Sequence, residues 1–309
     1  MKRAKISIIG SGNVGATAAH ICALKGLGDV VLVDIVDGIP QGKSLDISES
    51  LPIERKDCTV IGANTYDLTK DSDIVVITAG IARKPGMSRD DLLKVNTGIV
   101  KQVSEKVKEY SPECILIVVS NPLDAMVYVA YKATGFPKKR VMGMAGILDS
   151  ARFASFIAAE AGVSVENVST LVLGGHGDQM IPLPDYATIA GIPIKQFIPQ
   201  NRIDQIVQRA RDGGAEIVGL LKTGSAYYAP GSSIVEMIDA ILKDKKKILP
   251  CAAYLDGEYG ARGVFIGVPA KLGKDGVEEI VELDLSEPEK EAFAKNVEHV
   301  KSLCGITGV

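Results

Sequence analysis

The sequence predicts an α/β protein in which an N-terminal doubly wound parallel sheet is followed by an α+β domain. Three observations lead to this prediction. Short β-branched segments alternate with longer amphipathic segments as far as about Gly146, which is typical of parallel strands joined by crossover helices. A glycine-rich motif directly follows the first short segment. Beyond Gly146, long helical segments separated by fewer strands replace the alternation.

Six strands are expected in the first part of the chain, where apolar residues run almost without interruption. A sheet that is covered by helices on both faces requires such strands, because both of their sides are buried. The segments are residues 6–10, 30–34, 59–62, 74–80, 114–121 and 141–144. Helices are expected at 13–25 and 90–110; in the second of these, apolar residues recur every three to four positions. This combination indicates a doubly wound sheet.

The second part of the chain predicts a different organisation. We expect helices at about 149–161, 202–222, 232–243 and 287–303, strands at 168–173, 249–255 and 264–268, and a glycine-rich turn at 174–178. The change of pattern predicts two domains, residues 1–146 and 147–309. Because no Ser- or Pro-rich linker marks the boundary, an extensive interface between the two parts is expected.

Composition and charge exclude several classes of protein. The 309 residues are 46% hydrophobic and 24% charged, which is typical of a globular protein and not of a disordered one. A net charge of −3 provides no basic field for nucleic acid or a membrane surface. No apolar run approaches the ~18 residues of a membrane span, and no signal peptide or metal site is expected. Five widely spaced cysteines without a C-x-x-C pair favour reduced thiols and a cytoplasmic location: Cys22, Cys58, Cys114, Cys251 and Cys304.

The glycine-rich motif predicts a dinucleotide site. Gly10 allows a tight turn, Gly12 allows the backbone to approach a pyrophosphate, and Gly15 allows the helix and strand to pack closely. The N-terminus of the following helix offers N–H groups to the phosphates. Asp34 ends the second strand segment 19 residues after Gly15; its carboxylate can bind the ribose hydroxyls of NAD and would repel the extra phosphate of NADP. The alternative, a glycine turn with an unrelated surface Asp, does not explain why motif, position and spacing agree.

Two further strand ends are expected to complete the cofactor site, because ligands of open α/β sheets bind beyond the carboxyl ends of the strands. They are Thr78-Ala79-Gly80 and Val119-Ser120-Asn121. Asn121 precedes a proline, so two interpretations remain open: it is a substrate ligand, or it only forms the turn. The sequence does not determine whether the Asn121-Pro122 bond is cis.

His176 is the candidate proton carrier. It lies in a glycine-rich turn after an apolar strand, where small neighbours leave the imidazole accessible, whereas His20 and His299 fall inside predicted helices. An imidazole that exchanges protons usually needs a carboxylate that accepts its second N–H. Asp149 offers that carboxylate, and Arg152 lies on the same helix face three residues later. Alternatively, these two residues form an ordinary ion pair at a helix start.

The loop at 81–89 carries three cations, Arg83, Lys84 and Arg89, together with proline and glycine. By itself, such a loop is compatible with a solvated charged surface. Its arginines are also compatible with a lid that closes over a substrate and excludes water.

Taken in order, these residues resemble the lactate/malate dehydrogenase superfamily. The resemblance covers essentially the whole chain and is carried by Gly10-x-Gly12-x-x-Gly15, Asp34, Arg83, Arg89, Asn121-Pro122, Asp149-x-x-Arg152 and Gly175-His176-Gly177. Segments 145–153 and 174–178 are similar to the lactate-dehydrogenase-like malate dehydrogenases of bacteria and archaea.

The resemblance implies an N-terminal Rossmann domain that binds NAD, and a C-terminal α+β catalytic domain. The implied reaction is reversible hydride transfer between (S)-malate and NAD+, giving oxaloacetate and NADH, which belongs to the tricarboxylic acid cycle. Catalytic residues would be His176 and Asp149; substrate ligands would be Arg83, Arg89, Asn121 and Arg152. Cofactor ligands would be Gly10, Ser11, Gly12, Asn13, Val14, Gly15, Asp34, Thr78, Ala79, Gly80, Asn96, Val119, Ser120 and Asn121.

The resemblance also bears on substrate choice and assembly. Related lactate dehydrogenases carry a neutral residue, often Gln, where this chain has Arg83, and a second carboxylate on the substrate needs a cation there. Ala226 would leave room near the far end of the substrate. A lactate dehydrogenase is therefore disfavoured, and a non-catalytic NAD-binding protein would require the loss of a site residue, which is not observed. A homo-oligomer is expected, a tetramer being favoured over a dimer.

Overall fold

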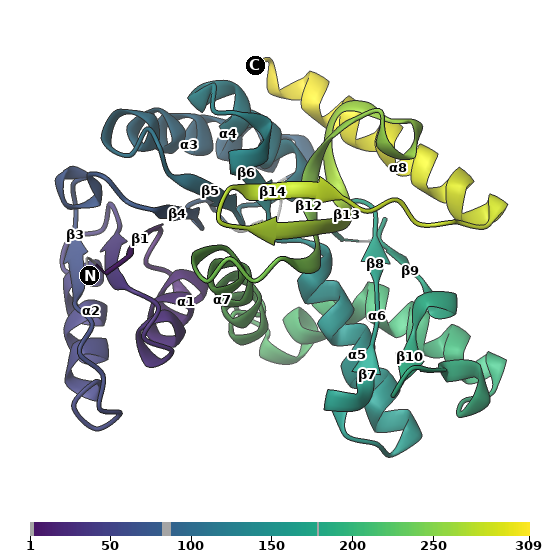
Figure 1. Cartoon of the computed structure of the whole chain (residues 1–309). Coiled ribbons are helices and arrows are strands. Elements are labelled where there is room, and N and C mark those ends of the chain that lie inside the picture. The colour runs from purple at the N-terminus through teal and green to yellow at the C-terminus, as the bar shows by residue number, and fades with distance from the viewer. Residues whose placement is uncertain (1–2, 82–87, 178) are drawn as a thin grey trace.

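The computed structural model describes residues 3–81, 88–177 and 179–309 (Figure 1). In these residues, nine strands form one sheet in the order β14-β13-β12-β6-β5-β4-β1-β2-β3. Six of them are parallel: β1 (Lys5–Ile9), β2 (Asp29–Val33), β3 (Val60–Ala63), β4 (Ile74–Ile77), β5 (Ile115–Val118) and β6 (Val141–Gly143). Their order, 3-2-1-4-5-6, is that of a doubly wound Rossmann sheet, so the predicted fold class is confirmed.

Helices cover both faces of this sheet, as Figure 1 shows. On one face lie α1 (Asn13–Leu24), α2 (Ile39–Ser50) and α7 (Tyr228–Leu242). On the other lie α3 (Arg89–Tyr110), α4 (Leu123–Thr134) and α8 (Glu287–Thr307). The strands are accordingly buried on both sides, which explains their nearly continuous apolar sequences.

The six predicted strands are all present; two of them end three residues earlier than expected, and the other ends differ by one residue at most. Segments 74–80 and 114–121 end as strands at Ile77 and Val118, because the residues that follow turn away from the sheet to line cavities at its edge. Helices α2 and α4 were not predicted. The apolar pattern is weak in α2, where few side chains are buried. Most residues of α4 are buried.

The second part of the chain contributes α5 (Gly146–Ala161), α6 (Gln200–Leu221), α7 and α8. The single strand expected at 168–173 is two short strands, β7 (Val168–Ser169) and β8 (Val172–Leu173), because the chain changes partner between them. The other strands are β9 (Ile181–Pro182), β10 (Thr188–Ile189), β11 (Ile192–Pro193), β12 (Lys247–Asp256), β13 (Arg262–Gly273) and β14 (Gly276–Ile280). Short 3-10 turns lie at Asp67–Thr69, Lys138–Arg140, Val165–Asn167, Pro184–Tyr186, Ile194–Gln196 and Glu258–Gly260.

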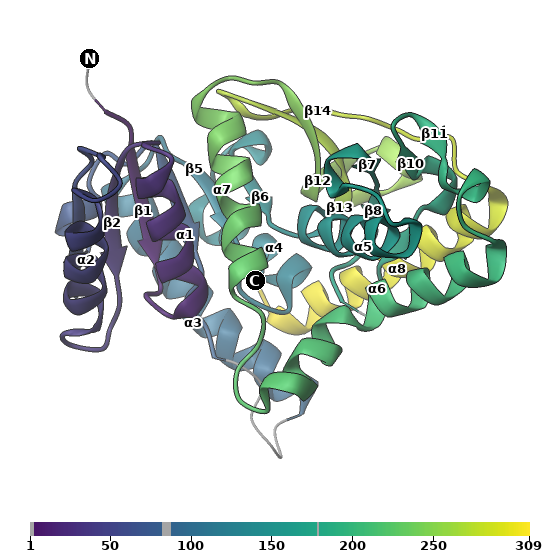
Figure 2. The same ribbon diagram turned by 90° about the horizontal axis from the view of Figure 1, so that it is seen from below.

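The sheet continues across position 146. Strand β12 pairs antiparallel with β6 through Ala252 and Gly143, and then with β13 along its whole length. Helix α7 lies beside α1, as both views show (Figure 2). The aromatic rings of Tyr131 in α4 and Phe265 in β13 meet edge to face, 5.4 Å apart. An extensive interface between the two parts is thus confirmed, whereas their division into domains at residue 146 stays a prediction.

All five cysteines are free, and Cys22, Cys114 and Cys251 are buried, in agreement with the expectation of reduced thiols. Across the described ranges, no helix combines the length and the apolar character that a bilayer crossing demands.

Candidate active site

Two adjoining cavities open at the carboxyl ends of the parallel strands. The first, of about 830 Å³, is lined by Gly10, Gly12 and Asp34. The second, of about 470 Å³, is lined by Asn121, Arg152 and His176. Both include Thr78, Gly80 and Ile81 in their walls, so they are neighbouring compartments of one cleft. The residues predicted from two separate parts of the sequence therefore meet in space.

The glycine motif forms the floor of the first cavity. Gly10 has a φ of +110°, and a β-carbon on it would lie 2.6 Å from Oγ1 of Thr78. A β-carbon on Gly15 would lie 2.0 Å from the carbonyl oxygen of Gly10, so only glycine allows α1 to pack this closely on the turn. Gly12, at the N-cap of α1, faces open space within 4 Å. The first and third glycines are thus needed for packing, and the second leaves room for a phosphate.

Asp34 is anchored at the end of β2 and lines the same cavity. Its carboxylate accepts the backbone N–H groups of Ser11, at 2.7 Å, and of Val36, at 3.1 Å. The Ser11 hydroxyl is buried with no hydrogen-bond partner among the described residues. Ile35, which is 95% exposed, adds an apolar wall beside the carboxylate. An open phosphate cradle, a carboxylate at ribose distance along the strand end and an apolar wall together fit NAD.

The other predicted cofactor residues surround this cleft. Asn13 and Val14 begin α1, and Val14, Val119 and Ser120 line the second cavity. The Thr78 hydroxyl donates to the Gly10 carbonyl at 2.9 Å, and the Ser120 hydroxyl donates to the Ala79 carbonyl at 2.5 Å. These bonds join the ends of the strands that form the cleft.

Asn96, predicted from the resemblance, lies in the second cavity wall and is almost fully buried. Its amide oxygen accepts the Ile81 N–H at 2.9 Å, and its amide nitrogen donates to the Asn121 carbonyl at 2.6 Å. Asn96 thus ties two turns of the cleft together. Asn121 itself is exposed at the cavity, and its bond to Pro122 is cis. It is both a turn residue and part of the pocket wall, so the two interpretations of Asn121 are compatible.

His176 follows β8 in a loop that the sheet holds in place. Gly174 pairs with Gly267 of β13, and a β-carbon on Gly267 would lie 2.5 Å from the Gly174 carbonyl oxygen. The imidazole Nδ1 of His176 lies 2.9 Å from Oδ2 of Asp149. The other carboxylate oxygen of Asp149, Oδ1, accepts a hydrogen bond of 3.0 Å from the guanidinium of Arg152. One buried carboxylate therefore bridges the histidine and the arginine.

Helix α5 presents Asp149 and Arg152 on one face, three residues apart. Its first residue is Gly146, on which a β-carbon would lie 2.6 Å from the Val172 carbonyl oxygen, so α5 can approach β8 closely. The side chain of Asp149 is 1% exposed, that of Arg152 12% and that of His176 18%. The carboxylate is thus buried, whereas the imidazole and the guanidinium reach the cavity.

The pKa of His176 is raised above its ordinary value. Burial lowers this pKa because it disfavours the charged imidazolium, but the negative charge of Asp149 and its hydrogen bond to Nδ1 raise it, with a further contribution from Asp124. The carboxylates outweigh the desolvation. The protonated imidazole is consequently stabilised beside the cavity.

Arg152 has binding capacity left after its bond to Asp149. Its Nε is buried without a hydrogen-bond partner in the described part of the chain. Helix α6 makes room for the side chain through two successive glycines: a β-carbon on Gly213 would lie 3.1 Å from Cδ of Arg152, and one on Gly214 3.9 Å from a terminal nitrogen. An unpaired guanidinium nitrogen in a cavity suits a carboxylate ligand.

The structure describes only part of the predicted lid, which contains Arg83 and Arg89. Arg83 lies outside the described residues, as does the side chain of Arg89, whose backbone begins α3. Ala226 lines the second cavity, in agreement with the expectation from the resemblance. His20 and His299 lie in α1 and α8, as the predicted helices required.

Two residues near His176 were not predicted. Asp124, in the first turn of α4, accepts the backbone N–H of His176, and Asn296 of α8 accepts that of Gly175. Asp124 has a weak sequence signal, since it follows the Asn121-Pro122 turn closely. Asn296 has none, because it comes from a predicted helix far along the chain.

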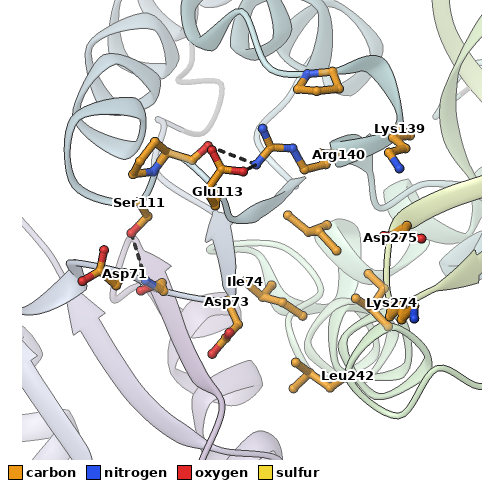
Figure 3. A pocket seen from close by; sticks show the side chains of 15 residues that line it. Asp71, Asp73, Ile74, Ser111, Glu113, Lys139, Arg140, Leu242, Lys274 and Asp275 are labelled. Atoms are coloured by element: carbon orange, nitrogen blue, oxygen red, sulfur yellow. Dashed lines mark hydrogen bonds and ion pairs between the residues drawn. The ribbon is translucent and has the colours of Figure 1, made fainter.

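A third cavity, of about 640 Å³, lies at the opposite, amino ends of β4 and β5 (Figure 3). Both acidic and basic side chains line it, and Arg140 forms an ion pair of 3.3 Å with Glu113. Because no single ligand charge matches this lining, the cavity is a poor candidate for the active site.

Gly15 is closely packed and Gly12 is open, so one added methyl group should have a different effect at each position. We expect Gly15→Ala to lower the free energy of unfolding by about 1–3 kcal/mol or more, since its β-carbon meets backbone. Gly12→Ala, the matched control, should leave stability nearly unchanged and weaken NADH binding. Chemical unfolding and NADH fluorescence titration measure the two effects. Equal destabilisation by both variants would contradict the assigned roles.

Comparison with known proteins agrees with this geometry. Residues 4–143 match the family model of the lactate/malate dehydrogenase NAD binding domain, and residues 147–304 match that of the lactate/malate dehydrogenase alpha/beta C-terminal domain. A malate dehydrogenase of Heliobacterium modesticaldum is 61% identical to the chain over 100% of both sequences.

Solved structures agree as well. The chain resembles the malate dehydrogenase of Cryptosporidium parvum, with a TM-score of 0.97 and 46% identity over 99% of both chains. It also resembles the lactate dehydrogenase of the same organism, solved with lactic acid and nicotinamide adenine dinucleotide, with a TM-score of 0.96 and 43% identity over 100% of this chain and 99% of that one. Two family models that together span nearly the whole length, and a relative at this identity, lead to one conclusion: the chain belongs to the lactate/malate dehydrogenase family.

Proposed function

We propose that the protein is an NAD-dependent malate dehydrogenase that interconverts (S)-malate and oxaloacetate. The observation that carries this proposal is the arrangement of His176, Asp149 and Arg152 in a cavity that adjoins the cradle for NAD. A proton carrier, its carboxylate partner and a carboxylate-binding cation are the groups that oxidation of a 2-hydroxy acid requires. The family and the names of the similar proteins support the same activity.

The proton passes through the free nitrogen of His176. Since Nδ1 bonds to Asp149, Nε2 is the atom that takes the hydroxyl proton of malate or returns it to the carbonyl oxygen of oxaloacetate. NAD, when bound, supplies or accepts the hydride. Asp149 holds the imidazole in one tautomer and stabilises the imidazolium after proton uptake. Neutral His176 thus serves malate oxidation, and protonated His176 serves oxaloacetate reduction.

Arg152 is proposed to bind the carboxylate next to the reacting carbon. Its buried, unpartnered Nε and a terminal nitrogen can donate in parallel to the two carboxylate oxygens. Asn121, exposed at the same cavity, is placed to donate to the substrate oxygen. The resemblance assigns Arg89 to polarising the carbonyl, where a cation would stabilise the charge that develops on oxygen.

The choice of a dicarboxylate rests on Arg83 and on the similar proteins, since the backbone fold does not discriminate between substrates. The malate and lactate dehydrogenases of Cryptosporidium parvum match the chain with TM-scores of 0.97 and 0.96. A lactate dehydrogenase is therefore the second candidate. Arg83 disfavours it, because a guanidinium beside the methyl group of pyruvate would lack a partner, whereas the second carboxylate of oxaloacetate supplies one.

The proposal also includes the cellular location, the pathway and the oligomeric state of the enzyme. Free cysteines support a reducing, cytoplasmic location, and the reaction would serve the tricarboxylic acid cycle. Exposed apolar side chains in and just after α2, and in α6 and α7, support a homo-oligomer, for which we favour a tetramer. They are Leu45, Ile53, Leu220 and Tyr228, all more than half exposed in the single chain.

The raised pKa of His176 predicts opposite pH dependences for the two directions. The kcat/KM for malate oxidation should be retained above this pKa and lost as the pH falls through it, because the neutral base is required. The kcat/KM for oxaloacetate reduction should be retained below the pKa and lost above it. Initial rates in both directions across pH 5–9 measure this.

His176→Asn should lower kcat by about 10²–10⁴-fold while NADH still binds. Robust turnover in that variant would require another acid/base.

Arg83→Gln tests substrate choice. Loss of one partner of a desolvated charge pair costs about 2–5 kcal/mol, so kcat/KM for oxaloacetate should fall by roughly 30-fold to several thousand-fold relative to pyruvate. NADH oxidation with oxaloacetate, pyruvate and 2-oxoglutarate measures the change side by side. An unchanged ratio of the oxaloacetate and pyruvate values would remove Arg83 from substrate recognition.

If the exposed apolar side chains form subunit interfaces, the mass of the native protein should be that of an oligomer. Light scattering of the purified protein should give the mass of four chains, and Leu45→Glu combined with Leu220→Glu should reduce it, because charges at a buried interface are costly. A wild-type mass of two chains would support the dimer instead. A monomeric wild type at micromolar concentration would refute assembly.

A further inference from the structure

Asp124 is a buried carboxylate that the proposed mechanism does not yet use. It lies in the first turn of α4, where the helix dipole favours negative charge, and only 5% of the residue is exposed. Its Oδ2 accepts the backbone N–H of His176 at 3.1 Å. Its Oδ1 is buried and lacks a hydrogen-bond partner within the described ranges. A neutral acceptor would satisfy the N–H equally well, so the hydrogen bond alone does not explain why a carboxyl group is buried here.

The loop before His176 is clamped from two elements. Asn296 of α8 accepts the Gly175 N–H at 3.0 Å, next to the bond that Asp124 forms with His176. A β-carbon on Gly175 would lie 3.3 Å from Oδ2 of Asp124 and 3.4 Å from Oδ1 of Asn296. The loop therefore fits closely against both side chains. Asp124 is ionisable and Asn296 is neutral, so substitutions at the two positions separate the effect of charge from that of the hydrogen bond.

We propose that Asp124 is a positioning residue for the acid/base histidine: its carboxylate fixes the main chain of His176 and places a second negative charge beside the imidazole. This inference rests on the proposed function, in which His176 carries the proton. Asp124 follows the Asn121-Pro122 turn, so the same turn that places Asn121 in the substrate cavity also holds the histidine. The wall of the substrate cavity and the proton carrier are thereby joined through four consecutive residues, 121–124.

The charges around the imidazole determine what Asp124 contributes. Asp149 and Arg152 reach His176 from α5, Asp124 from α4, and Cys304 of α8 lies in the field of Asp124. Burial raises the pKa of Asp124 to about 7, while the His176 N–H and the imidazolium charge lower it. The carboxylate and the imidazole each favour the charged form of the other.

The first test measures the His176 imidazole directly, without turnover. The chain has three histidines, so ring-labelled histidine should give three resolvable signals in the full-length protein, and His176→Asn identifies the one of interest. In Asp124→Asn, which keeps an acceptor of the same shape but removes the charge, the His176 titration should move to lower pH. In Asn296→Ser, which weakens the hydrogen bond from the Gly175 N–H, the His176 titration should stay at the wild-type pH.

The second test uses the two reaction directions. In Asp124→Asn, the acid limb of malate oxidation and the alkaline limb of oxaloacetate reduction should both move to lower pH, and kcat/KM should fall about 5-fold because a charged acceptor is replaced by a neutral one. In Asn296→Ser, kcat should fall without a shift of either limb. Asp124→Glu should restore the wild-type limbs at least in part.

Several results would overturn the inference. If the His176 titration in Asp124→Asn equals that of the wild type, or if Asn296→Ser shifts it equally, Asp124 has only a structural role. If Asp124→Asn does not fold, the wild-type protein still decides: the His176 signal must show the second inflection from Asp124, and a single inflection refutes the coupling. Absence of malate turnover in the wild type with a shifted imidazole titration in Asp124→Asn would refute the proposed function, while the coupling between Asp124 and His176 would still hold.

Discussion

The structure depends on one shared carboxylate. Asp149 is almost completely buried and bonds to His176 through one oxygen and to Arg152 through the other. A buried carboxylate is stable only while its partners are in place, so the helix that carries it and the loop that carries the histidine must keep their relative position. Gly146, Gly174 and Gly267 allow the close backbone approaches that maintain it. His176 and Arg152 are consequently positioned by the two oxygens of one carboxylate.

In the proposed function, recognition of a 2-hydroxy acid and choice among such acids are separate. The carboxylate and hydroxyl of the substrate would bind at Arg152 and His176, which line the second cavity. The resemblance assigns recognition of the variable end to Arg83, which lies between β4 and α3 in the sequence. Loops tolerate substitution better than packed helices do, so specificity can change there without disturbing the Asp149 pair. Family members that are named for different substrates can thus share nearly the same backbone.

The glycine-rich turn, His176 and Asp149 were predicted from the sequence as candidate site residues, because each lies in a short local pattern. The parallel strands were predictable because burial on both faces makes them uniformly apolar. Helix α2 was not predicted because few of its side chains are buried, so its apolar pattern is weak. Asp124 and Asn296 could not be assigned to the site, since their roles arise from contacts between segments that are distant along the chain. The change of pairing partner between β7 and β8 likewise depends on tertiary contacts and not on local propensity.

The sheet that runs through β6 and β12 has a consequence for the evolution of this protein. Cutting the chain near residue 146 would leave β6 as an open edge with unpaired backbone groups, and would uncover the side of α1 on which α7 packs. Neither half is therefore an interchangeable module, although each matches its own family model. Recombination that exchanges one half alone would have to preserve the Gly143–Ala252 junction, so the cofactor-binding part and the chemical part are expected to be inherited together.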